Sequence, residues 1–516
     1  MKQSVYKYIG LCYIIAFVIL LLASPDSYTH DLYQRTDSAN FYTSGKALAN
    51  GLIPYKDFAD SKGPLLWVIY AAAYMLSGHN YVGVFWLSTI LYAFVFFCIF
   101  KLAHIFLKTE EQSLLVVILM ASSFFSPWFH YEIRAEDWLQ LFIVLAIYRI
   151  CFFLYTDKGK DNVSTYITCF LMGICITGTF YIKYNCTVMI GAVCLYLLYA
   201  LIREKKNIVI SFASFFAGIG ILALPWIIYA IHMGCFDAFI HEYITNTMQT
   251  LEENNKLGEY LHEWLYLTYD THCILLFAIS YIGAIALSKK VNKYKNFFII
   301  SFIVFYAIGI HRCAFLHWYY ITVCLLFPVW SFIYLVDLLS NSKFSNPKLL
   351  RYIIVSISVY TIISNFFFWG HLTPTWFFRD TKARAEYYKA AYYMSQVASP
   401  TVIYYLCGTL GIETPVDGLP ATTYWTTQIG ATPEMMKKQI DAISSQRSDF
   451  IIAADNNKYP IHQTDSFITS RGYHPLMSFR ALETDFIMYS KHHLNEPPSN
   501  FHVSNTDVIL KKKLFK

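Results

Sequence analysis

The segment 25–63 carries five aspartates and ends near a lysine, and these residue types can do acid–base chemistry. Asp37 opens a short helical pattern, and Asp60 precedes Lys62 by two residues. A carboxylate within hydrogen-bond reach can take the proton of an attacking hydroxyl, and a nearby ammonium can stabilise an anion. Aspartate is also a common helix N-cap, and lysine often reaches from an apolar surface into water. The residue types alone leave both interpretations open.

Two further polar stretches have the same character. The string HYEIRAED at 130–137 places Glu132 and Glu136 next to an apolar run, and the stretch before residue 319 contains Arg312 and His317. Lys183 lies between two apolar runs. Ionisable groups at the edge of a membrane span are costly, so they suggest function by default. The alternatives are an ammonium that snorkels to the interface for Lys183 and a helix anchor for His317.

The composition places these residues in an integral membrane protein. Hydrophobic residues make up 56% of the 516 positions and charged residues 14%, whereas a soluble chain carries about a quarter charged residues. Aromatic residues reach 18%, as expected where many helix ends meet lipid interfaces. The net charge of +6 is spread over short clusters between apolar blocks, which argues against a nucleic-acid partner.

The apolar blocks predict eleven membrane-spanning helices. A span needs roughly 20 residues, and the run that follows Lys2 and Lys7 is interpreted as a retained first span because no small-residue cleavage site follows it. The predicted spans are 5–24, 82–107, 113–127, 137–155, 165–182, 186–202, 208–231, 271–288, 296–310, 319–338 and 350–368.

The basic residues predict the orientation of these spans. With a cytoplasmic N-terminus, every lysine and arginine cluster between spans falls on the inner side, as the positive-inside rule requires. The apolar segment 64–77 has only 14 residues, and counting it as a span would invert every later loop. We therefore predict an interfacial or re-entrant helix at 64–77 that stays on the outer side, and an outer, bacterial periplasmic location for residues 371–516.

The last part of the chain predicts a small α/β domain. A polar helical stretch at 379–396 precedes predicted strands at 401–406, 449–454 and 485–490 and a helix at 433–444. No phosphate-binding loop or dinucleotide fingerprint is present, which favours an accessory role in acceptor binding or as a lid. Of the 12 cysteines only Cys407 lies in this tail, so no disulfide framework is expected there.

Several strings resemble a known superfamily. The first loop reads D-S-A-x-F…G-K-A-L-x-x-G-x-x-P-Y-x-D-F-x-D-x-K-G-P-L and is similar to the first outer loop of GT-C glycosyltransferases, in the branch of the protein O-mannosyltransferases and the lipid A aminoarabinose transferase. GICITGTFYIK, LPWIIYAIHMGCFDAFIHEYI and RCAFLHWYYITVCLLFP resemble later motifs of that branch, in the same order. The chain departs from the pattern at Ser61, where the aminoarabinose branch has Glu, and at Gly63, where relatives often have Pro.

The resemblance implies an inverting transfer from a polyprenyl-phosphate-linked sugar to a cell-envelope glycan, lipid or protein. Asp37 would be the general base, and the lipid phosphate would meet Lys62, Lys183 and Arg312. Asp60 and one of Glu132 or Glu136 would supply further acids for substrate or metal, and these groups are expected to converge on one cavity open to the outer side. Asp57 and His317 would contact the acceptor or be structural. The sequence requires no cofactor and leaves room for a divalent cation.

We therefore predict an all-α polytopic GT-C type domain at 1–370, with the first outer loop at 25–81, followed by a periplasmic α/β domain at 371–516. One competing interpretation is a polysaccharide polymerase or O-antigen ligase, for which a large late outer loop rich in Arg and His would be expected. A secondary transporter is another, but the sequence shows no two-fold hydropathy repeat. A non-enzymatic membrane anchor would leave the aspartates of the first loop unexplained. The sequence identifies neither sugar nor acceptor.

Overall fold

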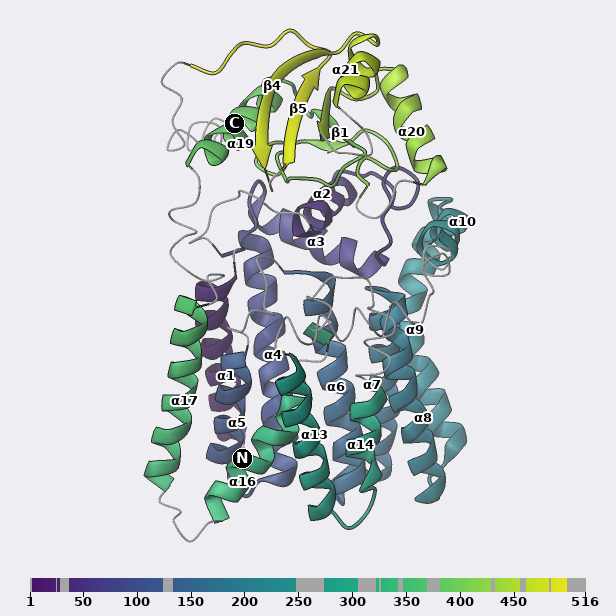
Figure 1. Cartoon of the computed structure of the whole chain (residues 1–516). Helices are drawn as coiled ribbons and strands as arrows, with labels where there is room; N and C mark the ends of the chain where they lie inside the picture. Colours follow the sequence, from purple (N-terminus) through teal and green to yellow (C-terminus); the bar gives the residue numbers. More distant parts are fainter. Residues whose placement is uncertain are drawn as a thin grey trace. The chain divides into compact units, whose positions relative to one another are not determined.

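The computed structural model describes residues 2–24, 26–27, 37–123, 133–246, 273–304, 322–323, 326–341, 347–368, 381–427, 432–454, 461–481 and 484–498 (Figure 1). Two compact units make up the chain. The helical unit contains Met1–Ser24, Trp86–Tyr229 and Gln249–Thr373. The loop–tail unit contains Pro25–Phe85, Ala230–Met248 and Pro374–Lys516. The expected domains divided the chain at residue 370, whereas the contacts place the tail in one unit with the first loop.

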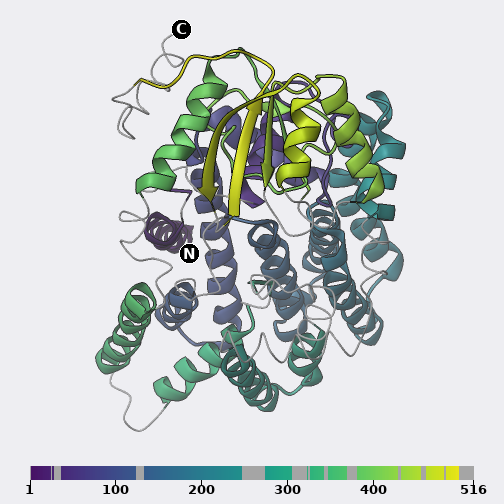
Figure 2. The ribbon, with the colours of Figure 1, turned by 45° about the horizontal axis from the view of Figure 1, so that its top comes forward.

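The helical unit is a set of helices that run alongside one another (Figures 1 and 2). A described helix overlaps each of the eleven predicted spans. Five of the described helices, including the short turn before α8, are long and apolar enough to cross a membrane: Val82–Phe106, Ala135–Tyr155, Asn162–Phe180, Tyr184–Arg203 and Ile208–His232. In chain order the helices are α1 Lys2–Ala23, α4 Val82–Phe106, α5 Glu110–Ser123, α6 Ala135–Tyr155, α7 Asn162–Phe180, α8 Thr187–Arg203, α9 Ile208–His232, α13 Cys273–Lys290, α14 Asn296–Ile303, α16 Pro328–Asn341 and α17 Pro347–Phe368.

Glycines determine how closely α7 and α9 approach. A Cβ on Gly173 would lie 2.0 Å from the carbonyl oxygen of Phe215, and a Cβ on Gly218 would lie 2.0 Å from that of Phe170. The contact is reciprocal, so each helix packs its glycine against the backbone of the other. Small residues serve this purpose in membrane helix packing, where close backbone contact replaces the hydrophobic driving force.

The first loop of the loop–tail unit folds into two helices that pack against each other. They are α2 (Asp37–Ala49) and α3 (Pro64–Ser77). The proline at the start of α3 suits a first helical turn, where its missing N–H has no partner to lose. A Cβ on Gly45 would lie 2.4 Å from the carbonyl carbon of Tyr70, so glycine permits the close crossing of α2 over α3. Helix α3 has the bounds that the apolar segment predicted.

The tail contains a mixed five-stranded sheet with the strand order β2-β1-β3-β5-β4. Strands β1 and β2 are parallel, as are β1 and β3, whereas β5 is antiparallel to both β3 and β4. Ile403, Ile451 and Tyr489 of the sheet form a core with Ile443 and Ile468 of the covering helices. The elements are α19 Thr381–Ser395, β1 Thr401–Tyr405, β2 Leu419–Pro420, α20 Pro433–Ser444, β3 Phe450–Ala454, α21 Ile461–Thr469, β4 His474–Ala481 and β5 Thr484–Ser490.

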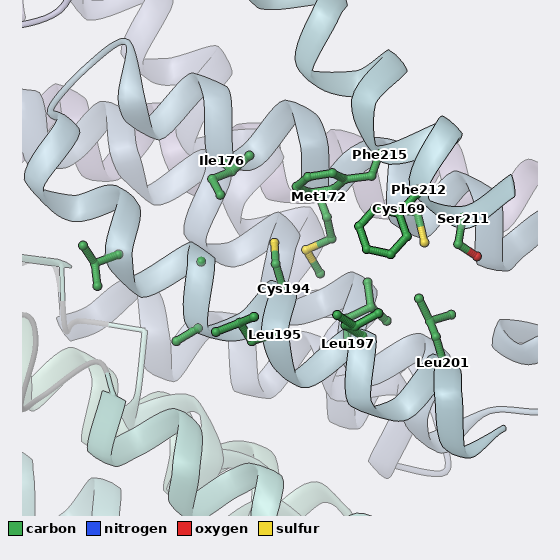
Figure 3. A pocket seen from close by; sticks show the side chains of 14 residues that line it. Cys169, Met172, Ile176, Cys194, Leu195, Leu197, Leu201, Ser211, Phe212 and Phe215 are labelled. Atoms are coloured by element: carbon green, nitrogen blue, oxygen red, sulfur yellow. The ribbon is translucent and has the colours of Figure 1, made fainter. Parts of the chain in front are cut away.

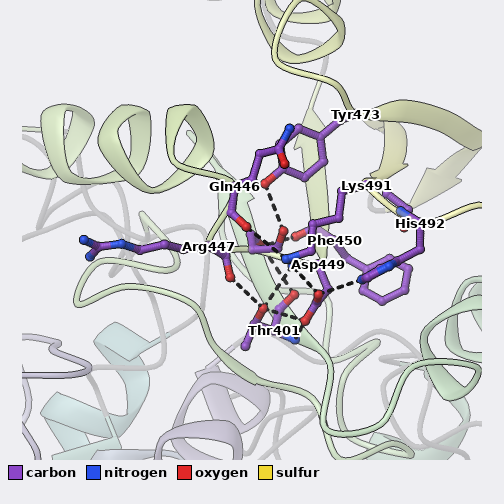
Figure 4. Close-up of polar contacts among 10 residues, drawn as sticks. Thr401, Gln446, Arg447, Asp449, Phe450, Tyr473, Lys491 and His492 are labelled. Atoms are coloured by element: carbon purple, nitrogen blue, oxygen red, sulfur yellow. Dashed lines mark hydrogen bonds and ion pairs between the residues drawn. The ribbon is translucent and has the colours of Figure 1, made fainter.

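Asp449, directly before β3, connects the beginning of β3 to the beginning of β1 and to the residues that follow β5 (Figure 4). Its Oδ2 accepts hydrogen bonds from the backbone N and Oγ1 of Thr401, at 2.9 and 2.8 Å. Its Oδ1 lies 3.0 Å from Lys491 Nζ and 2.8 Å from His492 Nε2. Burial alone would raise the pKa of this carboxyl, but the hydrogen bonds from His492, Thr401 and Lys491 outweigh burial and lower the pKa to about 2.

Candidate active site

Asp37 is the first described residue of α2 and lies half-buried in its first turn. The helix is polar, yet its residues from Ser38 to Ala47 are all buried. A carboxylate in the first turn is favoured by the helix dipole, so this position suits Asp37 both structurally and as an anionic base. Burial of a polar helix requires that its side chains find hydrogen-bond partners.

Asp60 and Lys62 lie beside this helix. Asn40, one turn after Asp37, donates from Nδ2 to Asp60 Oδ2. Ser61 Oγ donates to Asp60 Oδ1 at 3.0 Å, and Lys62 Nζ donates to Ser61 Oγ at 3.1 Å. The lysine ammonium is 3.7 Å from Asp60 Oδ1, and both side chains are about nine-tenths buried. The structure therefore brings Asp60 and Lys62 to the first turns of the helix that carries Asp37.

Asn40 was not recognised from the sequence. Its Oδ1 is buried and has no hydrogen-bond partner among the described residues. Its spacing from Asp37 is i to i+3, which places the two side chains on one face of a helix, and that spacing is the signal that could have found it. An amide that binds Asp60 through its nitrogen leaves its oxygen able to accept a hydrogen bond from a hydroxyl group.

A tight turn presents Lys62. Tyr55 has a φ of 66°, in the left-handed region, and its hydroxyl donates to the carbonyl oxygen of Lys62 at 2.7 Å. Its ring contacts Phe239 and Tyr243, with centroids 5.3 and 6.2 Å away. Asp57 closes the same turn, because its Oδ2 accepts from the backbone N of Ile53 at 2.7 Å. Asp57 therefore has a structural contact, the second of the two roles expected for it.

The helices Phe236–Phe239 (α10) and Ile240–Thr245 (η3) supply those aromatic rings, and η3 is a π-helix. Its Glu242 is buried and accepts hydrogen bonds from Tyr424 OH at 2.5 Å and Asn246 Nδ2 at 2.9 Å. Burial and the adjacent carboxylate raise the pKa of Tyr424, so its hydroxyl keeps its proton and donates. Single π-helical turns are frequent at functional sites. Here the turn holds the ring of Tyr243 against Tyr55.

The helical unit contains a second acid–lysine pair. Lys183 Nζ donates to Glu136 Oε1 in a direct ion pair, and the two side chains are 9% and 3% exposed. The neighbouring Asp137 is occupied otherwise: it accepts from Arg134 N at 2.8 Å and from Tyr92 OH at 2.6 Å. Of the two described acids of this stretch, Glu136 is thus the one that faces a lysine, and Lys183 is paired instead of snorkelling.

The remaining predicted site residues, Glu132, Arg312 and His317, lie outside the described residues. Asp60 and Lys62 belong to the loop–tail unit, and Glu136 and Lys183 to the helical unit. Their convergence on one cavity stays a prediction. Within the described ranges, no group of three or more His, Cys, Asp or Glu side chains is arranged to hold a metal ion. The sequence allows a divalent cation but does not require one, and this expectation stays untested.

An apolar pocket of about 490 Å³ lies between α7, α8 and α9 (Figure 3). Its volume is that of a small-molecule site, and hydrocarbon side chains dominate its walls. None of the predicted site residues is among the described residues that line it. The labelled lining residues are Cys169, Met172, Ile176, Cys194, Leu195, Leu197, Leu201, Ser211, Phe212 and Phe215.

Comparison with known proteins identifies the class of fold. Residues 61–229, about a third of the chain, match the family described as dolichyl-phosphate-mannose-protein mannosyltransferase. The structure is similar to the crystal structure of ArnT from Cupriavidus metallidurans bound to undecaprenyl phosphate, with a TM-score of 0.63 and 11% identity over 95% of this chain and 98% of that one. The apo structure of the same protein gives a TM-score of 0.59 and 9% identity over 94% and 98%.

No curated protein matches the sequence significantly. The two crystal structures nevertheless cover almost the whole chain, including the tail with its sheet. The predicted fold class, a polytopic GT-C type protein with a small C-terminal sheet domain, is confirmed. The predicted similarity of the chain to this superfamily is confirmed with it, whereas most of the first-loop string precedes the family match and its resemblance stays a prediction.

Proposed function

We propose that this protein is an inverting membrane glycosyltransferase that moves a sugar from a polyprenyl-phosphate-linked donor to a glycan, lipid or protein of the cell envelope. The observation that carries the proposal is the position of Asp60 and Lys62 against the helix of Asp37, within a fold shared with ArnT from Cupriavidus metallidurans. That protein was crystallised with undecaprenyl phosphate, a ligand with the chemistry that the lysine would recognise.

The residues of the first loop have distinct roles in this reaction. Asp37 takes the proton of the acceptor hydroxyl as its oxygen attacks the anomeric carbon, and the bond to the lipid phosphate breaks on the opposite face. The leaving group is a stable phosphate anion, so it requires cations and no proton donor. Lys62 supplies such a cation. Asp60 and Ser61 hold its ammonium in place, which reduces the reorganisation required during the reaction.

Lys183 supplies a second cation in this proposal, and Arg312 a third. Glu136 orients the Lys183 ammonium, because their direct ion pair fixes the side chain inside the helical unit.

We further propose that the reaction takes place on the outer face of a bacterial inner membrane. The one-sided distribution of lysine and arginine between the spans supports this orientation. A reporter enzyme that functions only in the periplasm should be active when it is fused after residue 400. A fusion that works only in the cytoplasm would reverse the orientation and with it the location of the reaction.

The activity can be measured with the purified full-length chain. Polyprenyl-phosphate sugars, presented singly, should be consumed with release of polyprenyl phosphate when extracts of envelope glycans, lipids or proteins are added. Transfer only from pyrophosphate-linked oligosaccharides would instead indicate a polymerase or ligase. We expect turnover to persist in EDTA, and mass spectrometry of envelope glycans and lipids from a deletion strain would identify the acceptor.

A further inference from the structure

The tail binds α2 through one fully buried glutamate. Glu413 Oε1 accepts hydrogen bonds from Thr43 Oγ1 at 2.7 Å and from Thr409 Oγ1 at 3.0 Å. Its Oε2 accepts from the hydroxyl of Tyr404, on β1, at 2.7 Å. Three donors thus converge on one carboxylate that has no exposed surface. Thr43 is the donor that comes from the first loop.

A fully buried lysine reinforces the same junction. Lys46, one turn after Thr43, donates from Nζ to the carbonyl oxygens of Glu413 and Val416, at 2.7 and 2.8 Å. A buried charge is tolerated only when it is hydrogen-bonded, and both the Lys46 ammonium and the Glu413 carboxylate meet this condition through the bonds given above. Burial and the Glu413 charge raise the pKa of Tyr404 well above its usual value, so its hydroxyl stays protonated and donates.

Further contacts bring the tail against the beginning of α2. Gly411 has a φ of 75°, and a Cβ there would lie 3.0 Å from the Cβ of Ala39. Tyr387 OH donates to the carbonyl oxygen of Gly411 at 2.6 Å, and Tyr81 OH lies 2.9 Å from Thr414 Oγ1. The turn around Glu413 is therefore fixed on several sides.

Helix α2 is consequently held by two different segments. Thr43 and Lys46 bind the tail, whereas Asn40 binds Asp60 of the first loop. Asp37 lies on the same short helix, about two turns from the Glu413 junction. A movement of α2 relative to the tail would therefore displace Asp37 from Asp60 and Lys62.

We propose that Glu413 is a positioning residue, which fixes α2 so that the carboxylate of Asp37 is aligned for proton abstraction. This inference rests on the proposed function. It assigns to the tail a role inside the catalytic apparatus, different from the accessory or lid role that its sequence suggested. Small displacements of a reacting group are costly: about 1 Å can reduce a rate by roughly a hundredfold.

The test compares substitutions that remove one buried hydroxyl each. Thr43→Val and Tyr404→Phe remove donors to Glu413, and Thr43→Ser restores the first. Tyr473→Phe is the matched control, because Tyr473 is a buried tyrosine of the tail whose hydroxyl donates to the carbonyl oxygen of Ser448 at 2.9 Å, outside the junction. Tyr404→Phe and Tyr473→Phe should lower the melting temperature of the full-length protein by similar amounts.

The readouts separate positioning from general stability. We expect Thr43→Val and Tyr404→Phe to lower kcat by about tenfold with little change in the KM of the donor, whereas Thr43→Ser and Tyr473→Phe stay within about twofold. Amide hydrogen exchange of residues 37–49 should become faster in the first two variants only. Equal kcat in Tyr404→Phe and Tyr473→Phe would overturn the proposal.

The failure of the proposed function gives a different result. If the wild-type chain transfers no sugar from any polyprenyl donor, the glycosyltransferase assignment fails, and hydrogen exchange alone decides whether Glu413 fixes α2. Unchanged exchange of residues 37–49 in Thr43→Val and Tyr404→Phe would then refute the junction as a positioning device.

Discussion

The two compact units are assembled by different means. In the helical unit, apolar helices pack through close backbone contacts such as Gly173 against Phe215, and its buried ion pair joins Glu136 on α6 to Lys183 just after α7. The loop–tail unit joins three segments that are far apart in the sequence, and buried polar groups such as Thr43, Lys46 and Glu413 connect them. Where water is excluded, hydrogen-bonded polar groups specify one arrangement, whereas apolar contacts tolerate several.

The largest effect on turnover should come from replacing Asp37, the proposed general base. Asp37→Asn keeps the size of the side chain and its suitability at a helix N-terminus but cannot accept the proton, so sugar transfer should fall by about a hundredfold or more with the protein still folded. Asp37→Ala should additionally cost about 1 kcal/mol of stability. Near-normal turnover of Asp37→Asn, measured with a polyprenyl-phosphate donor, would assign the base to Asp60 or Glu136.

The ion pair of the helical unit should show the next largest effect. Removing one partner, as in Glu136→Ala, leaves a buried lysine charge and should cost about 3–5 kcal/mol. A double variant, Glu136→Gln with Lys183→Met, removes both charges and should recover much of this stability while remaining inactive. Thermal unfolding of both variants in detergent checks the prediction. A double variant that is as active as the wild type would restrict the pair to a structural role.

The acid stability of the tail offers a smaller, pH-dependent effect. Because Asp449 has a pKa of about 2 in the folded chain and about 3.9 when unfolded, its ionised form stabilises the fold by about 2–3 kcal/mol above pH 4. This contribution is lost as the pH falls from about 4 to about 2. Asp449→Asn should therefore be less stable than the wild type at pH 7 and equally stable near pH 2. A difference that is constant with pH would contradict the role of the charge.

The smallest effect on stability should come from the exposed side of α3. Met75 is 79% exposed and Leu76 is 64% exposed. In exposing apolar side chains, α3 resembles the helices of the helical unit more than the rest of the loop–tail unit. Met75→Gln should change the free energy of unfolding by no more than about 0.5 kcal/mol, whereas Leu66→Ala, on the buried face, should cost about 2–5 kcal/mol. Equal losses of stability in the two variants would show that the side of α3 with Met75 is also packed.

The difference between the units also explains what the sequence could predict. Hydropathy located the helices of the helical unit, and runs of β-branched and aromatic residues located β1, β3 and β5. Strand β2 has only two residues and β4 buries only two of its eight positions, so neither produces a hydrophobic pattern. The motif around Asp37, Asp60 and Lys62 was recognisable because these residues lie close in the sequence.

Long-range polar contacts could not be predicted in this way. Glu413 belongs to no local motif, and its partner Thr43 lies 370 residues away. Asn40 and Tyr55 act through neighbours that only the tertiary structure brings near. A single sequence carries a signal for periodicity, but the pairing of two polar residues across the chain depends on the folded geometry.

The junction of Thr43 with Glu413 also has a consequence for biosynthesis. At the usual rates of synthesis of about 5–20 residues per second, the 370 residues between these partners take roughly 20–70 s to make. Throughout that interval α2 lacks the acceptors for Thr43 and Lys46, so the earliest loop of the protein can reach its final form only after the last domain has been synthesised. A chain that ends before residue 413 would leave those donors without their partners, and quality-control proteases should degrade it quickly even though all its membrane helices are present.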